Sequence, residues 1–159
     1  MNLMTPTREE IPSSLQLGIP DGARVLLVSD DDSEAKVLRN LLCKAGFSSE
    51  SACCITAGCD AAKSGQFQVV ISIPQLRDGS WRRLIDIASH YDLRFELILW
   101  ARYFDFRDWG KALDDGAFDV LDSIHEGSRV VEATKCAFWA AYLKGAGLSP
   151  KPLRPHKAA

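Results

Sequence analysis

The sequence has no long apolar run, no strong excess of charge of one sign and no signal-like start, and each absence excludes a class of protein. Its 159 residues contain no stretch near the roughly 18 apolar residues that a membrane-spanning helix needs. The opening MNLMTPTREEIP has no basic segment followed by an apolar one, so no secretory signal is predicted. A net charge of −2 gives no general attraction to nucleic acid or anionic lipid. We expect a cytoplasmic protein with no membrane partner and no nucleic-acid partner.

Motifs for common enzyme chemistries are also missing. The chain has neither G-x-G-x-x-G nor G-x-x-x-x-G-K-[ST], the glycine-rich loops that cradle phosphates. His90, His125 and His156 have no Ser or Cys partner at motif spacing, so a hydrolytic triad has no support. We therefore expect no enzyme and no catalytic residues.

The five cysteines are odd in number and lack the C-x-x-C spacing of zinc and redox sites. They are Cys43, Cys53, Cys54, Cys59 and Cys136. Because free cysteine often behaves simply as a small hydrophobe, we expect reduced, metal-free cysteines. The adjacent Cys53 and Cys54 stay open as an oxidation-sensitive pair.

The chain does contain a regular alternation of apolar strands and helices, in a composition that is 47% hydrophobic and 25% charged. Strands are expected at 25–28, 47–54, 68–74, 95–101 and 117–124. Helices are expected at 33–46, 55–65, 81–91, 105–116 and 128–145. The first helix has Asp32 or Ser33 as a candidate N-cap and ends at Gly46, whereas Gly58 should interrupt the second. Residues 75–80, QLRDGS, predict a turn.

This alternation predicts an α/β domain in which helices cover both faces of one parallel sheet. We place the domain at 23–144, between a flexible leader at 1–22 that is rich in proline and glycine and a flexible tail at 145–159. In such folds the functional site lies at the carboxyl ends of the strands.

The segments VLLVSDDD, VVISI, LILWA and GAFDVLDSI occur in the order and spacing of the receiver domains of bacterial response regulators. The chain resembles this CheY-like family from Ala23 to about Gly145. The resemblance implies a flavodoxin-like, doubly wound (βα)5 fold with five parallel strands in the order 2-1-3-4-5. It also implies a site with two acids after strand one, a phosphoacceptor Asp after strand three, a Thr or Ser after strand four and a Lys after strand five.

This chain departs from the family pattern at four of those five positions. In register they are occupied by Ser29, Asp30, Ile73, Trp100 and Ser123. A slip of one residue at strand three offers Ser72, which cannot form the acyl phosphate that an Asp forms. Phosphoryl transfer needs a carboxylate nucleophile, oxygen ligands for Mg²⁺ and a cation for the developing charge. We therefore predict a degenerate pseudo-receiver without cofactor or Mg²⁺.

Two acidic features keep alternatives open. Asp30 and Asp31, followed by Asp32, are candidates for weak cation binding, although one acid commonly caps the next helix and the others face solvent. Asp78 or Asp30 could serve as a displaced phosphoacceptor, but an Asp-Gly pair such as Asp78 with Gly79 is typical of a turn. A third hypothesis is a flavodoxin-like domain that binds a small molecule or nucleotide, with Trp100 either stacking on a ring or filling the empty site.

Protein contacts are the function that remains. In the resembling family, the surface of helix four, strand five and helix five commonly meets partners or a second copy of the domain. Here that region offers an aromatic and arginine mix typical of interfaces, namely Tyr103, Phe104, Phe106, Arg107, Trp109, Phe138, Trp139 and Tyr142. About half should be core, because the last helix must bury Val130, Thr134, Ala137, Phe138 and Ala141. Trp109 and Trp139 are expected to be exposed.

The resemblance implies a signalling partner such as a histidine kinase or another response regulator, and a possible homodimer through that surface. The segment LSPKPLRPHKAA, with Lys151, Arg154 and Lys157, is compatible with a solvated terminus, a linker remnant or a short extended ligand.

Overall fold

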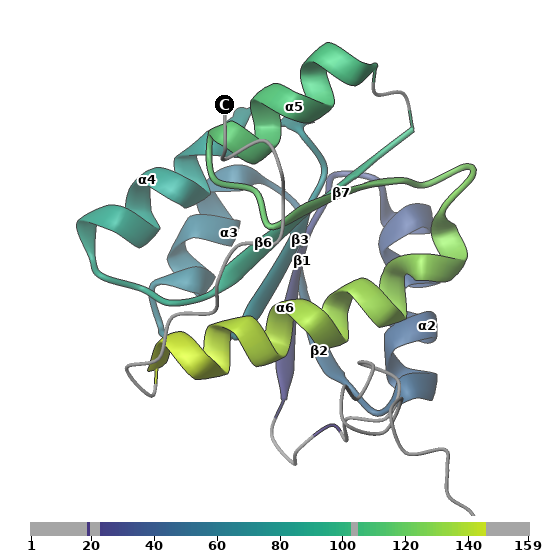
Figure 1. The fold of residues 1–159 in the computed structure, drawn as a ribbon, viewed down its shortest axis with the longest axis horizontal. Helices are drawn as coiled ribbons and strands as arrows, with labels where there is room; N and C mark the ends of the chain where they lie inside the picture. Colours follow the sequence, from purple (N-terminus) through teal and green to yellow (C-terminus); the bar gives the residue numbers. More distant parts are fainter. Residues whose placement is uncertain (1–18, 20–22, 103–104, 146–159) are drawn as a thin grey trace, which may run out of the picture.

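A parallel β-sheet of five strands forms the centre of the computed structural model, which describes Ile19 and residues 23–102 and 105–145 (Figure 1). The strands are β1 (Arg24–Val28), β2 (Ser48–Ala52), β3 (Val69–Ser72), β6 (Glu96–Ala101) and β7 (Asp119–Asp122). They lie in the order β2-β1-β3-β6-β7, and neighbouring strands run parallel. The predicted flavodoxin-like doubly wound fold is confirmed, because this is the expected order 2-1-3-4-5.

Helices cover both faces of the sheet (Figure 1). One face carries α2 (Asp32–Ala45) and α6 (Val130–Gly145), the latter preceded by the 3₁₀ turn η1 (Gly127–Arg129). The other carries α3 (Ile55–Ala62), α4 (Arg82–His90) and α5 (Phe106–Asp114). Successive strand residues point to opposite faces, so Leu27 and Ile98 join the α2/α6 core while Leu26 and Leu97 join the other. Both cores are apolar, which explains why the three central strands β1, β3 and β6 have no polar alternation.

Helix α2 begins one residue earlier than the sequence suggested. Asp31, not Asp32 or Ser33, is the N-cap: its backbone is extended, and its carboxylate accepts hydrogen bonds from the backbone N–H groups of Ser33 and Glu34. The chain turns at once after β1, so Asp32 is already helical. The predicted end is confirmed, since Gly46 takes the left-handed conformation with φ +102° that closes the helix.

Gly58 does not interrupt α3, contrary to the expectation. A Cβ atom at Gly58 would lie 2.9 Å from a methyl group of Val28, which is fully buried in β1. The glycine therefore permits a close approach of helix and sheet, and this contact offsets the roughly 1 kcal/mol by which glycine disfavours a helix relative to alanine.

The predicted turn at 75–80 is a small antiparallel hairpin. Its strands are β4 (Gln75–Leu76) and β5 (Gly79–Ser80), with Arg77 and Asp78 at the tip. Gly79 has φ +157°, and a Cβ there would lie 2.9 Å from Ile55, so glycine suits both the turn and the packing.

The five cysteines are free, and they differ in burial. Cys59 is buried in α3 and Cys54 is half-buried, whereas Cys43, Cys53 and Cys136 are exposed. Cys43 lies on α2 and Cys136 on α6. Both are exposed because helix periodicity places them on the face of each helix that points away from the sheet.

Within the described part of the chain, no helix combines the length and the apolar character needed to cross a membrane. The predicted leader (1–22) and tail (145–159) lie outside the described residues, apart from Ile19 and Gly145, and stay predictions.

Candidate functional site

The carboxyl ends of β1, β3, β6 and β7 meet at one edge of the sheet, and the five predicted site residues lie there. Ser29 directly follows β1 and is buried. Its hydroxyl accepts a hydrogen bond from the backbone N–H of Asp31 at 3.1 Å, and its own N–H donates to the carbonyl of Ala52 at 3.0 Å. Ser29 therefore shapes the turn between β1 and α2.

The acidic run after Ser29 is only partly open to a ligand. Asp30 is half-exposed, whereas the carboxylate of Asp31 already accepts two backbone hydrogen bonds, at 3.0 and 3.2 Å. Among the described residues, no group of three or more acidic, histidine or cysteine side chains is arranged to hold a metal ion. Cation binding by Asp30 and Asp31 stays a prediction.

Ile73 directly follows β3 and is half-buried. Its backbone N–H donates to the carbonyl of Val28 at 3.1 Å, and its side chain packs against both hydrophobic cores. The neighbouring Ser72 is buried and donates its hydroxyl to the carbonyl of Ile73 at 2.7 Å. The position therefore supplies no carboxylate, and the alternative hydroxyl is already hydrogen-bonded.

Trp100, the last residue but one of β6, is buried. Its residue is 4% exposed, and its ring lies in the α2/α6 core, 3.8 Å from where a Cβ on Gly127 would be. The indole Nε1 is buried and has no hydrogen-bond partner among the described residues. An unpaired buried donor costs about 1–3 kcal/mol, so packing of the ring must more than offset that cost.

Ser123 follows β7 and carries no charge. Its N–H donates to the carbonyl of Ala101 at 2.8 Å and extends the pairing with β6. Just before it, the Asp122 carboxylate accepts from the backbone N–H groups of Ile124 at 2.8 Å and His125 at 3.2 Å, and contacts Nδ1 of His125 at 2.9 Å. The hydrogen bond with the His125 ring, followed by those with the backbone, lowers the pKa of Asp122.

Asp78 holds the hairpin onto α3. Its carboxylate accepts from the backbone N–H groups of Ile55 at 2.8 Å and Thr56 at 3.0 Å, and from the Thr56 hydroxyl at 2.8 Å. The two backbone hydrogen bonds are the main reason that the pKa of Asp78 falls to about 2. The residue is thus a cap contributed by a distant segment. These donors engage the oxygens that a phosphoacceptor would use.

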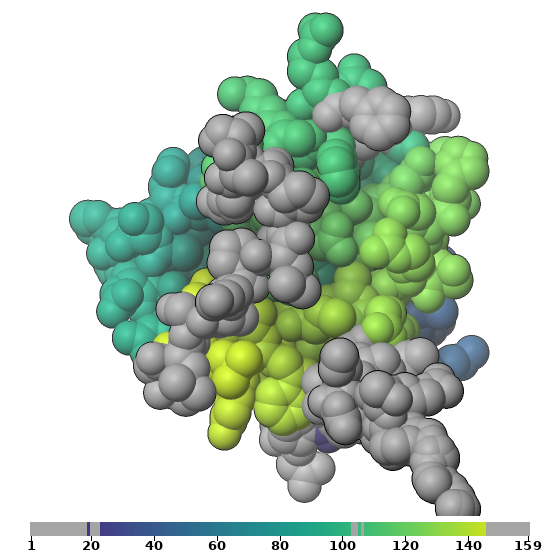
Figure 2. Space-filling view, in the orientation of Figure 1, coloured from purple at the N-terminus to yellow at the C-terminus, as the bar shows by residue number. Residues whose placement is uncertain are grey.

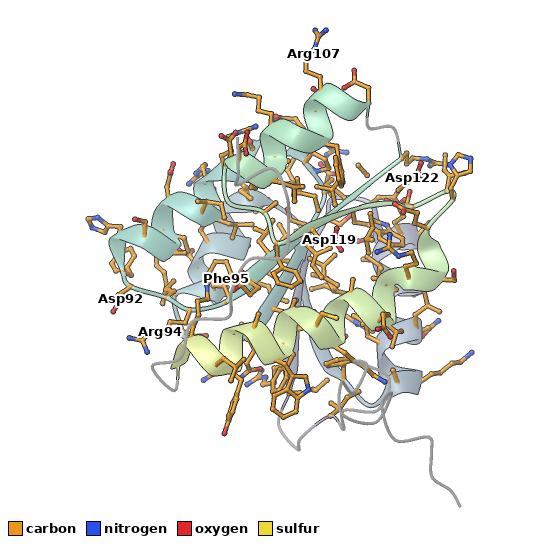
Figure 3. All side chains as sticks on the ribbon, viewed as in Figure 1. Asp92, Arg94, Phe95, Arg107, Asp119 and Asp122 are labelled. Atoms are coloured by element: carbon orange, nitrogen blue, oxygen red, sulfur yellow. The ribbon has the colours of Figure 1, made fainter. Side chains whose placement is uncertain are left out.

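A groove of about 650 Å³ lies along β7, between α5 and the segment that leads into α6. Its lining residues are Asp105, Trp109, Asp119, Val120, Asp122, His125, Glu126 and Arg129. Figure 3 shows Asp119 and Asp122 along β7, with α5 above them and α6 below. Figure 2 shows that α5, the segment after β7 and α6 all contribute to this face of the molecule.

The sequence predicted that Trp109 is exposed at an interaction surface, but it did not predict the other residues of this groove. The available signal was the placement of Asp119 and Asp122 on either side of the apolar pair that ends the last strand, with the acidic Glu126 shortly after. Nothing in the sequence shows that α5 stands far enough from this edge to leave a cavity.

The predicted interaction surface is divided between two helices on opposite faces of the sheet. Arg107 and Trp109 lie exposed on α5, with Trp109 42% exposed as expected. On α6, Tyr142 is 54% exposed, but the expectation for Trp139 is only partly right, because its ring packs against the α2/α6 core and edge-on to Tyr142.

The other residues predicted for this surface either lie outside the described residues or belong to the core of α6. Tyr103, Phe104 and the side chain of Phe106 lie outside the described residues. The predicted core set of α6 is confirmed, since the structure buries Val130, Thr134, Ala137, Phe138 and Ala141.

Comparison with solved structures identifies the fold. The signal receiver domain of a putative Luxo repressor protein from Vibrio parahaemolyticus superposes with a TM-score of 0.72 at 18% identity, covering 79% of this chain and 96% of that one. The chain has the fold of a receiver domain. A response regulator receiver domain protein from Clostridium thermocellum matches with a TM-score of 0.69 at 19% identity, over 77% of this chain and 98% of that one.

A third receiver structure, the beryllofluoride-activated NtrC4 receiver domain dimer, has a TM-score of 0.67 at 23% identity and covers 74% of this chain and 98% of its own. No protein-family model and no curated protein matches the sequence. At these identities the likeness concerns the receiver fold, and the divergent residues at the strand ends must be interpreted from their own chemistry.

Proposed function

We propose that this chain is a receiver-like signalling module that works through protein contacts and does not accept a phosphoryl group. The observation that carries the proposal is Ile73, which stands where receiver domains have their acceptor aspartate and packs, half-buried, against both hydrophobic cores. An acyl phosphate requires a carboxylate nucleophile at that point, and isoleucine has none.

The other strand ends support the same conclusion. Trp100 buries a large ring where a small hydroxyl would be needed, and Ser123 offers no cation to neutralise charge on the phosphoryl oxygens. Losing one such electrostatic contact costs about 10² to 10³ in rate even when the nucleophile is present. The chain therefore lacks the nucleophile, the small hydroxyl and the cation that phosphoryl transfer would need.

The proposed mode of action is recognition through the surface around α5 and β7, with a histidine kinase or another response regulator as partner. Exposed Arg107 and Trp109 are the residue types that anchor such interfaces. A homodimer through α5, β7 and α6 is a second arrangement, for which the NtrC4 receiver dimer is a precedent in the same fold. The proposal keeps the cytoplasmic location predicted from the sequence.

Two alternatives have less support. The Asp78 carboxylate is engaged by three donors, which disfavours it as a displaced acceptor. A flavin or nucleotide bound at the strand ends would need an accessible ring, whereas Trp100 lies in the core. A ligand-dependent rise in melting temperature with either compound class would revive that alternative.

The test is exposure of the full chain to acetyl phosphate and Mg²⁺, followed by intact-mass analysis, beside a receiver that has its acceptor aspartate. We expect the mass of this chain to stay unchanged while the comparison receiver gains one phosphoryl group. A stable, hydroxylamine-sensitive adduct on this chain would overturn the proposal.

The interaction surface has its own test, an affinity capture from the native lysate with wild type and Trp109→Ala. We expect the substitution to remove captured partners, and Tyr91→Ala, another exposed aromatic distant from β7 in sequence, to leave them in place. An identical set of partners from all three proteins would contradict the role of Trp109.

A further inference from the structure

The groove along β7 has an excess of negative charge. Among the described residues that line it, four carry carboxylates and Arg129 is the one fully charged cation, which gives these residues a formal charge of −3 with His125 neutral. A partly enclosed surface of one charge sign concentrates ligands of the other sign. The groove therefore favours a cationic ligand.

The cationic groups of the groove are already paired with its own acids. Arg129 forms an ion pair with Glu126 at 2.7 Å and lies 3.9 Å from an oxygen of Asp119. The ring of His125 contacts Asp122 at 2.9 Å. A ligand thus meets a net negative field, together with the exposed indole of Trp109, whose face is a favourable contact for Lys or Arg.

The chain carries a segment of complementary charge. Residues 146–159 lie outside the described residues, and their sequence, AGLSPKPLRPHKAA, contains Lys151, Arg154 and Lys157 and no acidic side chain. The formal charge of +3 matches the −3 of the groove. Prolines at 150, 152 and 155 favour an extended polyproline II conformation. Because that helix has three residues per turn, cations at every third residue share one side, about 9 Å apart.

The length of the segment also fits. Arg129, which lines the groove, directly precedes α6, and α6 runs for 16 residues to Gly145, or about 24 Å at 1.5 Å per residue. Figure 1 shows the two ends of α6 at opposite sides of the molecule. A chain that returns along α6 in an extended conformation covers about 3.1 Å per residue, so it needs about eight residues. That brings position 153 level with Arg129 and places Arg154 at the groove.

We infer that residues 153–157 of this same chain bind in the groove along β7, with Arg154 and Lys157 facing its carboxylates and Trp109, and with Lys151 where the segment enters the groove from α6. The groove is a binding site for an extended peptide with a cation at every third position. This goes beyond the proposed function, because neither phosphoryl transfer nor an external partner is involved.

The test compares amide and indole chemical shifts of three full-length proteins. They are wild type, a segment variant (Lys151→Glu, Arg154→Glu, Lys157→Glu) and a charge-matched control (Lys36→Glu, Lys44→Glu, Arg77→Glu). The control cations are exposed and do not line the groove. We expect the segment variant to shift the Trp109 indole and the amides of Asp119 and His125, and the control variant to leave them unchanged.

A synthetic peptide of residues 148–158, added to the segment variant, should return the groove resonances toward their wild-type positions. Its affinity should fall roughly tenfold or more between about 0.05 and about 0.5 M salt, because the contacts are between partly exposed charges. On the groove side, Asp105→Asn should weaken peptide binding, while Asp86→Asn, an exposed acid of α4, should not. Asparagine keeps the helix-capping ability of Asp105.

Three results would overturn the inference. Groove resonances that are the same in wild type and in the segment variant would show that the segment is not bound there. Shifts confined to other surfaces would place it elsewhere. Shifts that disappear on dilution together with a dimer seen by light scattering would identify a second copy, not the same chain, as the source of the bound segment.

Discussion

Replacing Trp100 with threonine, the residue type that the receiver pattern has there, should destabilise this protein. Truncating a large buried aromatic side chain costs about 3–5 kcal/mol. Loss of the unpaired Nε1 returns about 1–3 kcal/mol, so the net loss is about 2 kcal/mol. Domains of this size unfold with about 5–15 kcal/mol, and such a loss lowers the melting temperature by about 4–8 °C.

Two further substitutions separate packing from the missing hydrogen bond. Trp100→Phe keeps most of the ring in the α2/α6 core and removes the orphaned N–H, so its stability should stay within about 1 kcal/mol of wild type. Trp109→Ala truncates a ring that is 42% exposed, so it should cost less than Trp100→Thr.

Urea denaturation followed by far-ultraviolet circular dichroism measures these differences, provided that the slope of the transition stays constant across the variants. If Trp100→Thr proved as stable as wild type, the ring would not be part of the core. If Trp100→Phe proved the least stable of the three, the Nε1 proton would have a partner. Either result would refute the interpretation that packing keeps Trp100 where receivers need a hydroxyl.

Three other predictions concern single side chains. Gly58→Ala should destabilise the fold by about 1–2 kcal/mol, measured by urea denaturation, because overpacking against Val28 outweighs the gain in helix propensity. Gly110 in α5 has nothing within 4 Å of an added Cβ, so Gly110→Ala should stabilise the fold by about 0.5–1 kcal/mol. If Gly58→Ala proved the more stable of the two variants, the close packing of Gly58 against Val28 would be contradicted. Asp78→Asn should lower the melting temperature at neutral pH. The pKa of the Asp78 carboxyl is about 2 in the folded protein against an ordinary value of 3.8, so the stability that this carboxylate adds is present above about pH 4 and is lost as the pH falls toward 2. If the difference in melting temperature between wild type and Asp78→Asn did not shrink between about pH 4 and about pH 2, the role of Asp78 as a cap of α3 would be contradicted. Ile73→Asp alone should gain no phosphoryl group from acetyl phosphate by intact mass, because Ser123 still provides no cation; an adduct would show that the rest of the site works.

The order of the elements was predictable because it depends on local signals. Apolar runs such as those around Leu26 and Ile98 mark strands buried on both faces, and Gly46 marks a helix end. The residues at the strand ends followed from the same alignment, since each comes directly after a run of this kind. Whether Trp100 would be buried was left open by the sequence, and the structure buries its ring beside Gly127.

Other features depend on segments that are distant in sequence. Asp78 and Ile55 are 23 residues apart, and an Asp-Gly pair predicts the turn without showing which helix the carboxylate caps. The groove exists because α5 and the segment after β7 approach the sheet edge from two sides. Trp139 was expected to be exposed, yet it packs half-buried against the α2/α6 core. In each case the contact depends on how distant segments pack together, which the local sequence pattern does not show.

The carboxylates near this end of the sheet are largely committed to the backbone. Asp31 accepts from the first turn of α2, Asp78 from that of α3, Asp105 from that of α5, and Asp122 from the loop after β7. A Mg²⁺ ion for phosphoryl transfer needs several oxygen ligands with free lone pairs, and carboxylates used as caps offer fewer of them. The same acids that stabilise the turns therefore weaken the case for metal chemistry. What they leave accessible is negative charge on the outer surface, which a cationic segment can use without displacing any of the capping hydrogen bonds.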